Sequence, residues 1–212
     1  AVKIAVDMVK EKLISKNEAV LRIDPNSLDT LLHPTLDEKS NIEVIANGLP
    51  ASPGAASGKV VFTSEEAERL NDMMQETILV RVETSPEDIQ GMHAAKGILT
   101  ARGGMTSHAA VVARGMGRPC VSGSSEIDIN YEQKIFKTSS GEVKEGDTIT
   151  IDGSTGRIIL GNVPTVKPEI SGDFSKLMGW ADNIRKLKVR TNSETPIDTK
   201  IARDFGAEGI GL

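Results

Sequence analysis

The sequence contains one cysteine and few aromatic residues among its 212 residues. The single thiol, Cys120, excludes an internal disulfide framework and suits a reducing compartment, so we expect the protein to be cytoplasmic. Aromatic residues make up 3% of the chain and hydrophobic residues 38%. The core must therefore be built mainly from Val, Ile, Leu, Ala and Met, which suits helices packed closely on a sheet.

Long apolar runs and an excess of positive charge are also missing. No run approaches the roughly 18 residues that a membrane-spanning helix needs. The 25 basic and 30 acidic residues give a net charge of −5, so we expect neither nucleic acid nor an anionic membrane as a partner. The chain begins without Met and ends on an apolar stretch. We therefore expect it to be a segment of a longer protein.

The pattern along the chain divides it into five parts. Residues 1–32 show helical periodicity, with Asp24 and Pro25 as the start of a second helix. Residues 33–47 are predicted to be a linker, because Pro34 stops the helix and the charges that follow give nothing to bury.

Short apolar strands alternate with helices over residues 48–162, which predicts one mixed β/α domain. The predicted helices cover 64–74, 86–94 and 107–115. Residues 163–186 are predicted to be a second linker, whose first ten residues could extend over roughly 34 Å. A strand, a helix and a strand follow over 187–212. One such unit cannot bury both faces of a parallel sheet, so it is typical of the start of a further domain.

The segment "GGMTSHAAVVARGMG", residues 103–117, carries the main functional signal. A strand predicted over 97–101 runs into Gly103 and Gly104, and a helix starts at Thr106 or Ser107, so His108 falls in its first turn. Free backbone N–H groups and the helix dipole favour an anion there, and the glycines allow close approach of the backbone.

A histidine in this place is a candidate phosphoryl carrier. Imidazole is mostly neutral near pH 7, and its unprotonated nitrogen is a nucleophile. A phosphoryl group on His108 would face backbone donors, the hydroxyls of Thr106 and Ser107, and Arg102. Arg114 lies six positions further on, roughly 240° around the helix, so spacing alone gives it no catalytic role.

Other interpretations of the same residues remain open at this point. A histidine near a helix start is more often a cap or a packing residue than a nucleophile. A serine nucleophile at Ser107 would lack the G-x-S-x-G elbow, and a zinc site would require the three histidines and Cys120 to converge without short ligand spacing. Cys120 itself is typical of a buried small hydrophobic residue.

The motif "GGMTSHAAVVARGMGRPCVSG" closely resembles the phosphohistidine segment of the pyruvate, phosphate dikinase family. The similarity extends through "LLHP", "GLPASPGAASGKVVF", "VRVETSPEDIQGM", "IDGSTGRI" and "LKVRTNSETPIDT", which together span nearly the whole chain. Phosphoenolpyruvate synthase and the first enzyme of the bacterial sugar phosphotransferase system share this carrier domain but usually have Arg where Met105 stands. Met105 with Thr106 and Ser107 therefore favours the dikinases.

The resemblance implies a homodimeric phosphotransferase that converts ATP, phosphate and pyruvate into AMP, diphosphate and phosphoenolpyruvate, using Mg²⁺ and a monovalent cation. It implies a swivelling β/β/α domain over 48–162, with His108 carrying phosphoryl groups between two partners. These partners would be an N-terminal nucleotide-binding domain, ending in residues 1–32, and a C-terminal (β/α) barrel for phosphoenolpyruvate and pyruvate, starting in 187–212.

Two further expectations follow from the resemblance. Thr106 matches a threonine that plant members phosphorylate to switch the enzyme off, although its simpler role is a helix cap. The barrel's metal-binding acids, arginines and catalytic cysteine have no counterpart here, so the segment alone is expected neither to turn over nor to bind the cations. The alternatives are the carrier domain of phosphoenolpyruvate synthase, or a non-catalytic hinge or interaction module.

Overall fold

The computed structural model describes residues 1–25, 28, 33–37, 42–166, 172–193, 195–204 and 206–211. These residues form two compact units. One consists of Ala1–Asp24 with Ile170–Leu212, and the other of Pro25–Glu169. No helix within the described ranges is both long enough and apolar enough to cross a membrane.

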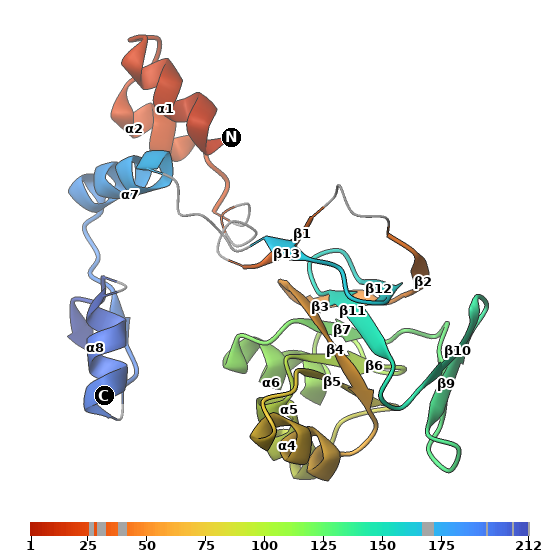
Figure 1. The fold of residues 1–212 in the computed structure, drawn as a ribbon. Helices are drawn as coiled ribbons and strands as arrows, with labels where there is room; N and C mark the ends of the chain where they lie inside the picture. The colour runs from red at the N-terminus through yellow and green to blue at the C-terminus, as the bar shows by residue number, and fades with distance from the viewer. Residues whose placement is uncertain are drawn as a thin grey trace. The chain divides into compact units, whose positions relative to one another are not determined.

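An eight-stranded mixed sheet forms the framework of the larger unit, in the order β2-β12-β11-β4-β5-β6-β7-β3 (Figure 1). Its strands are β2 (Val44–Asn47), β3 (Leu49–Ser52), β4 (Ala55–Val61), β5 (Thr77–Arg81), β6 (Gly97–Thr100), β7 (Cys120–Ser122), β11 (Thr148–Asp152) and β12 (Arg157–Leu160). The four strands β4 to β7 pair in parallel. Parallel neighbours need crossover connections, and these contain α4 (Ser64–Asp72), α5 (Ile89–Ala94) and α6 (His108–Met116).

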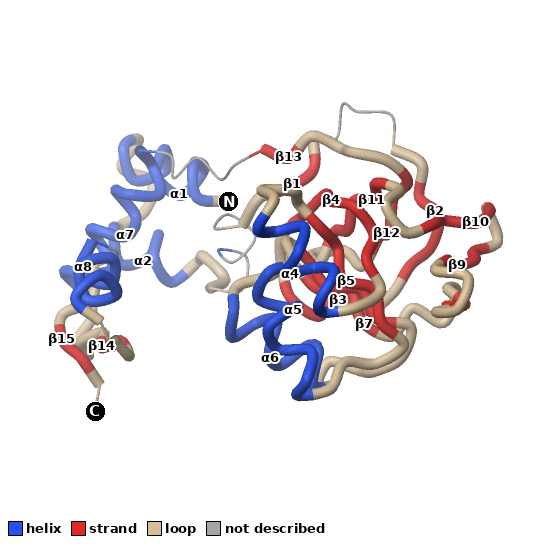
Figure 2. Tube along the Cα trace, turned by 60° about the horizontal axis from the view of Figure 1, so that its bottom comes forward, coloured by secondary structure: helices blue, strands red, loops and turns tan. Residues whose placement is uncertain are grey.

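The two faces of this sheet bury different partners. On one face, Leu79 packs in a cluster with Ala67, Met92 and Ala110 of the three helices. On the other face, a cluster that includes Ile78 also contains residues of a smaller sheet made of β8 (Asp128–Asn130), β9 (Ile135–Thr138) and β10 (Gly141–Lys144). Figure 2 shows the helices and the small sheet on opposite sides of the main sheet. This confirms the predicted β/β/α layering.

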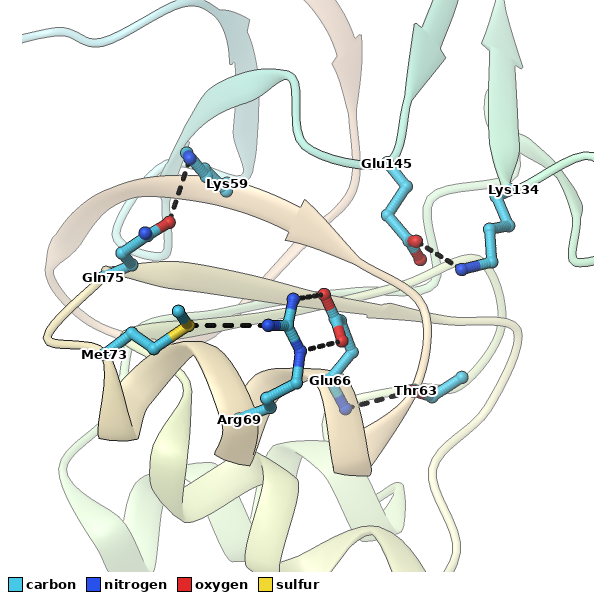
Figure 3. A network of polar contacts seen from close by, with 8 residues as sticks. All are labelled: Lys59, Thr63, Glu66, Arg69, Met73, Gln75, Lys134 and Glu145. Atoms are coloured by element: carbon cyan, nitrogen blue, oxygen red, sulfur yellow. Dashed lines mark hydrogen bonds and ion pairs between the residues drawn. The ribbon is translucent and has the colours of Figure 1, made fainter.

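Exposed polar contacts lie at the start of α4 and, separately, beside the small sheet (Figure 3). The Thr63 hydroxyl accepts the Glu66 N–H at 3.2 Å and so caps α4. Arg69 donates two hydrogen bonds of 2.7 and 2.8 Å to the Glu66 carboxylate, which hold the pKa of that carboxyl below its usual value. On the β9–β10 side, Lys134 donates to Glu145 at 2.5 Å. Because such exposed pairs contribute little to stability, the layers depend on their apolar clusters.

The structure corrects the linker predicted over residues 33–47. Thr35–Leu36 (β1) pairs with Thr165–Val166 (β13), and β2 is a strand of the main sheet, beside β12. Ile45 and Ala46 of β2 are buried. The pattern was hidden because these strands are short and their partners lie more than a hundred residues downstream.

The smaller unit contains α1 (Val2–Lys10), α2 (Lys16–Leu21) and α7 (Gly172–Ile184). Val6 and Leu177 are buried in it. The α7 helix corrects the linker predicted over 163–186, because it buries Leu177 and contacts α1 and α2 from the start of the chain. The second helix predicted from Asp24 falls mostly on residues 26–32, which lie outside the described ranges except for Leu28.

The last part of the chain confirms the predicted strand, helix and strand. Arg190–Thr191 (β14) pairs in parallel with Gly209–Ile210 (β15), and α8 (Pro196–Asp204) connects them. These three elements form a single βαβ unit, in which each strand has two residues.

Candidate functional site

His108 is the first residue of α6, at the end of the loop that follows β6. Ser107 precedes it with an extended backbone, and its Oγ accepts the Ala110 N–H at 3.4 Å. The helix ends at Gly117, which has the left-handed φ of 64°. The predicted helix start is thus confirmed at Ser107. The expectation that Thr106 is the cap is wrong, because the hydroxyl one residue later has the geometry to reach the free N–H.

The imidazole of His108 is half-buried and uses one of its two nitrogens. Its Nδ1 lies 3.0 Å from the hydroxyl of Thr84, in the loop after β5. Within the described part of the chain, Nε2 has no hydrogen-bond partner. The side chain therefore lies neither in the core nor fully in solvent, and it leaves Nε2 available.

The direction of the hydrogen bond between His108 and Thr84 decides which nitrogen is reactive. A neutral imidazole carries one proton, and the other nitrogen has the lone pair. If Nδ1–H donates to the Thr84 oxygen, the lone pair is on Nε2, which no neighbour occupies. If the hydroxyl donates to Nδ1, the proton is on Nε2 and the nucleophilic lone pair is engaged. Sequence reasoning missed Thr84, because it lies 24 residues before His108 and no short motif connects them.

The two glycines before the helix have different roles. Gly103 has a φ of +112°, and a Cβ there would lie 2.9 Å from the Ser107 Cβ and 3.0 Å from the Ser122 Oγ. Gly104 lacks a positive φ, and a Cβ there would meet nothing within 4 Å. Gly103 is therefore required by the turn and its close packing, whereas Gly104 lines open space beside the helix start.

Hydrogen-bonded hydroxyl groups connect this loop to β6 and β7. The Oγ atoms of Ser107 and Ser122 are 3.3 Å apart, and Ser122 in turn lies 3.1 Å from the Thr100 hydroxyl. Thr100 also donates to the Arg102 carbonyl at 2.8 Å. Thr100 and Ser122 are fully buried. Buried hydroxyls need such partners, and these fix the loop on the ends of β6 and β7.

Two arginines flank the loop in different ways. Arg114 donates from Nε to the Ala110 carbonyl at 3.0 Å and from its guanidinium to the Met105 carbonyl. It therefore braces the loop, a role that its spacing on the helix did not reveal. The backbone N–H of Arg102 donates to the Val82 carbonyl at 2.9 Å. Arg102 and Thr106 are both exposed residues. Among the described residues, neither of these two side chains makes a hydrogen bond or an ion pair.

The structure does not bring together the residues of the alternative zinc site. Among the residues described, no three His, Cys, Asp or Glu side chains lie close enough to hold a metal ion. Cys120 is fully buried in β7, as predicted, and burial raises the pKa of its thiol to about 12.

Residues 73–156, which include His108 and Thr84, match the family described as "PEP-utilising enzyme, mobile domain". The whole chain is 61% identical to a segment of pyruvate, phosphate dikinase from Rhizobium meliloti and 58% identical to a segment of the Clostridium symbiosum enzyme. It is 55% identical to a segment of pyruvate, phosphate dikinase 2 from Zea mays. The chain spans 24% of the length of each of these relatives. The chain is therefore similar to the mobile domain of PEP-utilising enzymes over residues 73–156 and, over its whole length, to one segment of the pyruvate, phosphate dikinases.

Proposed function

We propose that this chain is the phosphoryl-carrier segment of a pyruvate, phosphate dikinase and that Nε2 of His108 carries the phosphoryl group. The observation that supports this most directly is the asymmetry of the imidazole, whose Nδ1 is held by Thr84 while Nε2 has no partner among the described residues. The position of the ring at the start of α6 adds a local preference for negative charge.

The chemistry consists of two displacements at phosphorus. In loading, the Nε2 lone pair attacks the phosphorus of the donor, an N–P bond forms, and the bond to the donor's leaving oxygen breaks. In discharge, an oxygen of the acceptor attacks the same phosphorus, and the N–P electrons return to Nε2. The first-turn N–H groups of His108 and Ala109 and the exposed side chains of Arg102 and Thr106 are the donors available to the phosphoryl oxygens.

The complete enzyme would use this carrier between two remote sites. We assign loading to an N-terminal nucleotide-binding domain and discharge to a C-terminal barrel, with the carrier domain swivelling between them in a homodimer. The net reaction would convert ATP, phosphate and pyruvate into AMP, diphosphate and phosphoenolpyruvate. We assign the Mg²⁺ and the monovalent cation to the other domains of the complete enzyme.

Thr106 is the candidate for regulation of this carrier. Its residue is exposed, and it lies two positions before His108 in the loop. A phosphate on its hydroxyl would add about −1.5 to −2 charges beside the incoming phosphoryl group and repel it. Replacement of Thr106 by Glu should therefore slow loading much more than replacement by Val, which removes one hydroxyl donor but adds no charge.

Labelling with phosphoenolpyruvate tests the carrier function. Incubation of the chain with phosphoenolpyruvate and a separately supplied barrel domain should give an acid-labile, alkali-stable phosphate that His108→Ala abolishes. His93→Ala, at an exposed histidine of α5, is the matched control and should leave the label in place. Label that persists in His108→Ala would reject the assignment.

Two further measurements separate the alternatives. A hinge or interaction module would leave the complete enzyme active after His108→Ala, but Ser107, not His108, makes the capping hydrogen bond of α6. The second measurement is whether phosphoenolpyruvate formation requires inorganic phosphate as a substrate. A dikinase requires it, whereas a phosphoenolpyruvate synthase uses water in its place.

A further inference from the structure

The loop that presents Thr84 to His108 is fixed on both sides. At its start, the Val82 N–H donates to the Tyr131 hydroxyl at 2.8 Å, and the Val82 carbonyl accepts the Arg102 N–H at 2.9 Å. At its end, the Ser85 N–H donates to Oδ2 of Asp88 at 2.9 Å. Thr84 therefore lies between two anchors.

Asp88 has surroundings that a helix cap does not require. Its residue is only 4% exposed, and its Oδ1 lies 3.0 Å from the Ser64 hydroxyl and 3.3 Å from Nε of Arg81. Gly91 makes the first of these contacts possible, because a Cβ there would lie 2.5 Å from the Ser64 Cα. A buried carboxylate is costly unless it is paired and hydrogen-bonded, and here each oxygen has a polar partner.

The chain contains an internal comparison for Asp88. Thr195-Pro196-Ile197-Asp198 repeats the pattern of Ser85-Pro86-Glu87-Asp88. The Thr195 N–H donates to Asp198 at 3.1 Å, the same capping contact that Ser85 makes. Asp198 is nevertheless exposed, and no arginine contacts it among the described residues. The burial and ionic contact of Asp88 therefore go beyond what the capping pattern needs.

The second anchor, Tyr131, joins the same cluster from the small sheet. Tyr131 directly follows β8. Its ring centroid lies 5.4 Å from the Arg81 guanidinium carbon and 6.3 Å from the ring centroid of Phe62, with the two rings edge to face. Arg81 also donates to the Phe62 carbonyl at 3.0 Å. Arg81 thus contacts both anchors, and the cluster couples the small sheet and the start of α5 to the loop that carries Thr84.

We propose that Asp88 and Tyr131 are positioning residues for His108, which act by holding Thr84 on Nδ1. Neither residue contacts the imidazole, so neither is catalytic. With the loop fixed, the Thr84 oxygen accepts Nδ1–H and the lone pair stays on Nε2. This inference rests on the proposed carrier function, because only a nucleophilic Nε2 makes the tautomer matter.

The test compares the tautomer of His108 with its rate of phosphorylation. Tyr131→Phe removes one oxygen from a residue that is 41% exposed, so the fold should persist; Asp88→Asn removes the charge of the other anchor. In ¹⁵N spectra of the 212-residue chain with the ring neutral, each should move the tautomer ratio toward Nε2–H by about two- to tenfold, the range of a single hydrogen bond. In the complete enzyme, labelling by phosphoenolpyruvate at saturating substrate should slow in proportion to the lost fraction of the Nδ1–H tautomer, by at most the same factor.

Two controls make the result specific. Asp198→Asn removes the equivalent capping contact elsewhere and should leave the His108 spectrum of the 212-residue chain unchanged. Thr84→Val should reproduce the effect of Tyr131→Phe, and the double variant should be no slower than Thr84→Val alone, because both act through one hydroxyl.

An unchanged His108 spectrum and rate in a folded Tyr131→Phe chain would overturn the proposal, whether or not Asp88→Asn folds. So would a Tyr131→Phe effect that simply multiplies with that of Thr84→Val. A label that survives His108→Ala would instead reject the carrier function itself, which the tautomer measurement does not address. The two failures are therefore distinguishable.

Discussion

Gly103 and Gly104 are equivalent in the sequence but not in the structure. Gly103 has a positive φ and close neighbours, whereas Gly104 has neither. A residue with a Cβ is strained at a positive φ, by about 1–3 kcal/mol. The backbone conformation therefore requires glycine at position 103, whereas position 104 has room for a side chain.

We predict that Gly103→Ala lowers the free energy of unfolding by about 1–3 kcal/mol, while Gly104→Ala changes it by less than about 0.5 kcal/mol. Urea denaturation of the two variants measures both values. Equal losses in the two variants would contradict the distinction.

Cys120 makes the free energy of unfolding depend on pH above neutrality. Burial raises the pKa of its thiol from 9.0 to about 12. At pH 7 the thiol is protonated in the folded and unfolded chain, so it contributes no pH dependence there. Above about pH 9 only the unfolded chain loses the proton, so unfolding becomes more favourable as pH rises, by up to about 1.4 kcal/mol per pH unit.

We predict that the stability of the chain falls more steeply between pH 8 and 10.5 than that of Cys120→Ala. Urea denaturation at the two pH values measures this difference, in which contributions common to both proteins cancel. The folded chain should also resist thiol reagents at pH 8 and react once unfolded. Parallel pH profiles for the two proteins would show that the thiol titrates normally.

At the scale of the element, α6 depends on one capping hydroxyl. Ser107 accepts the Ala110 N–H, as Thr63 accepts the Glu66 N–H at the start of α4. Both helices have nine residues. The two caps are therefore a matched pair, and only one of them precedes His108.

We predict that Ser107→Ala and Thr63→Ala each lower the free energy of unfolding by about 0.5–2 kcal/mol. Only Ser107→Ala should also slow the labelling of His108, because it frays the turn that carries the imidazole and removes a hydroxyl next to Ser122. Thermal unfolding and labelling rates check the two effects. A similar loss of labelling in Thr63→Ala would show that the effect is one of stability alone.

Element prediction succeeded where local chemistry is strong. The capping pattern around Ser85 and Pro86 predicted a helix over 86–94, and the structure has a 3₁₀ turn, Pro86–Asp88, followed by α5. It failed for β2 and α7. β2 pairs with β12, and α7 contacts α1 and α2, so the partners that stabilise these two elements lie far away in the sequence.

At the scale of the molecule, the larger unit contains its own cores. The clusters on the two faces of the main sheet lie entirely within residues 25–169. A third cluster, around Leu36, Ile159 and Val163, lies there as well and joins β1 to the end of the domain. A unit of this size with separate apolar cores should fold independently.

We predict that residues 25–169 expressed alone unfold in one cooperative transition, whereas residues 48–162 alone are less stable. The shorter piece lacks β2 and the pairing of β1 with β13, so it exposes Ile159 and leaves the edge of β12 unpaired. Differential scanning calorimetry of the two pieces measures this. A shorter piece as stable as the longer one would show that β1 and β2 are not structural parts of the domain.

The sequence by itself determined the alternation of strands and helices in the larger unit, the start of α6 and the place of His108 in its first turn. Periodicity, caps and turn residues act over a few positions, and the sequence carries them directly. Only the tertiary structure placed Thr84 on Nδ1, separated the roles of Gly103 and Gly104, and buried Asp88 against Arg81. These contacts join residues on different strands and loops, and their distances follow from how the sheet brings its loops together, which no local pattern records.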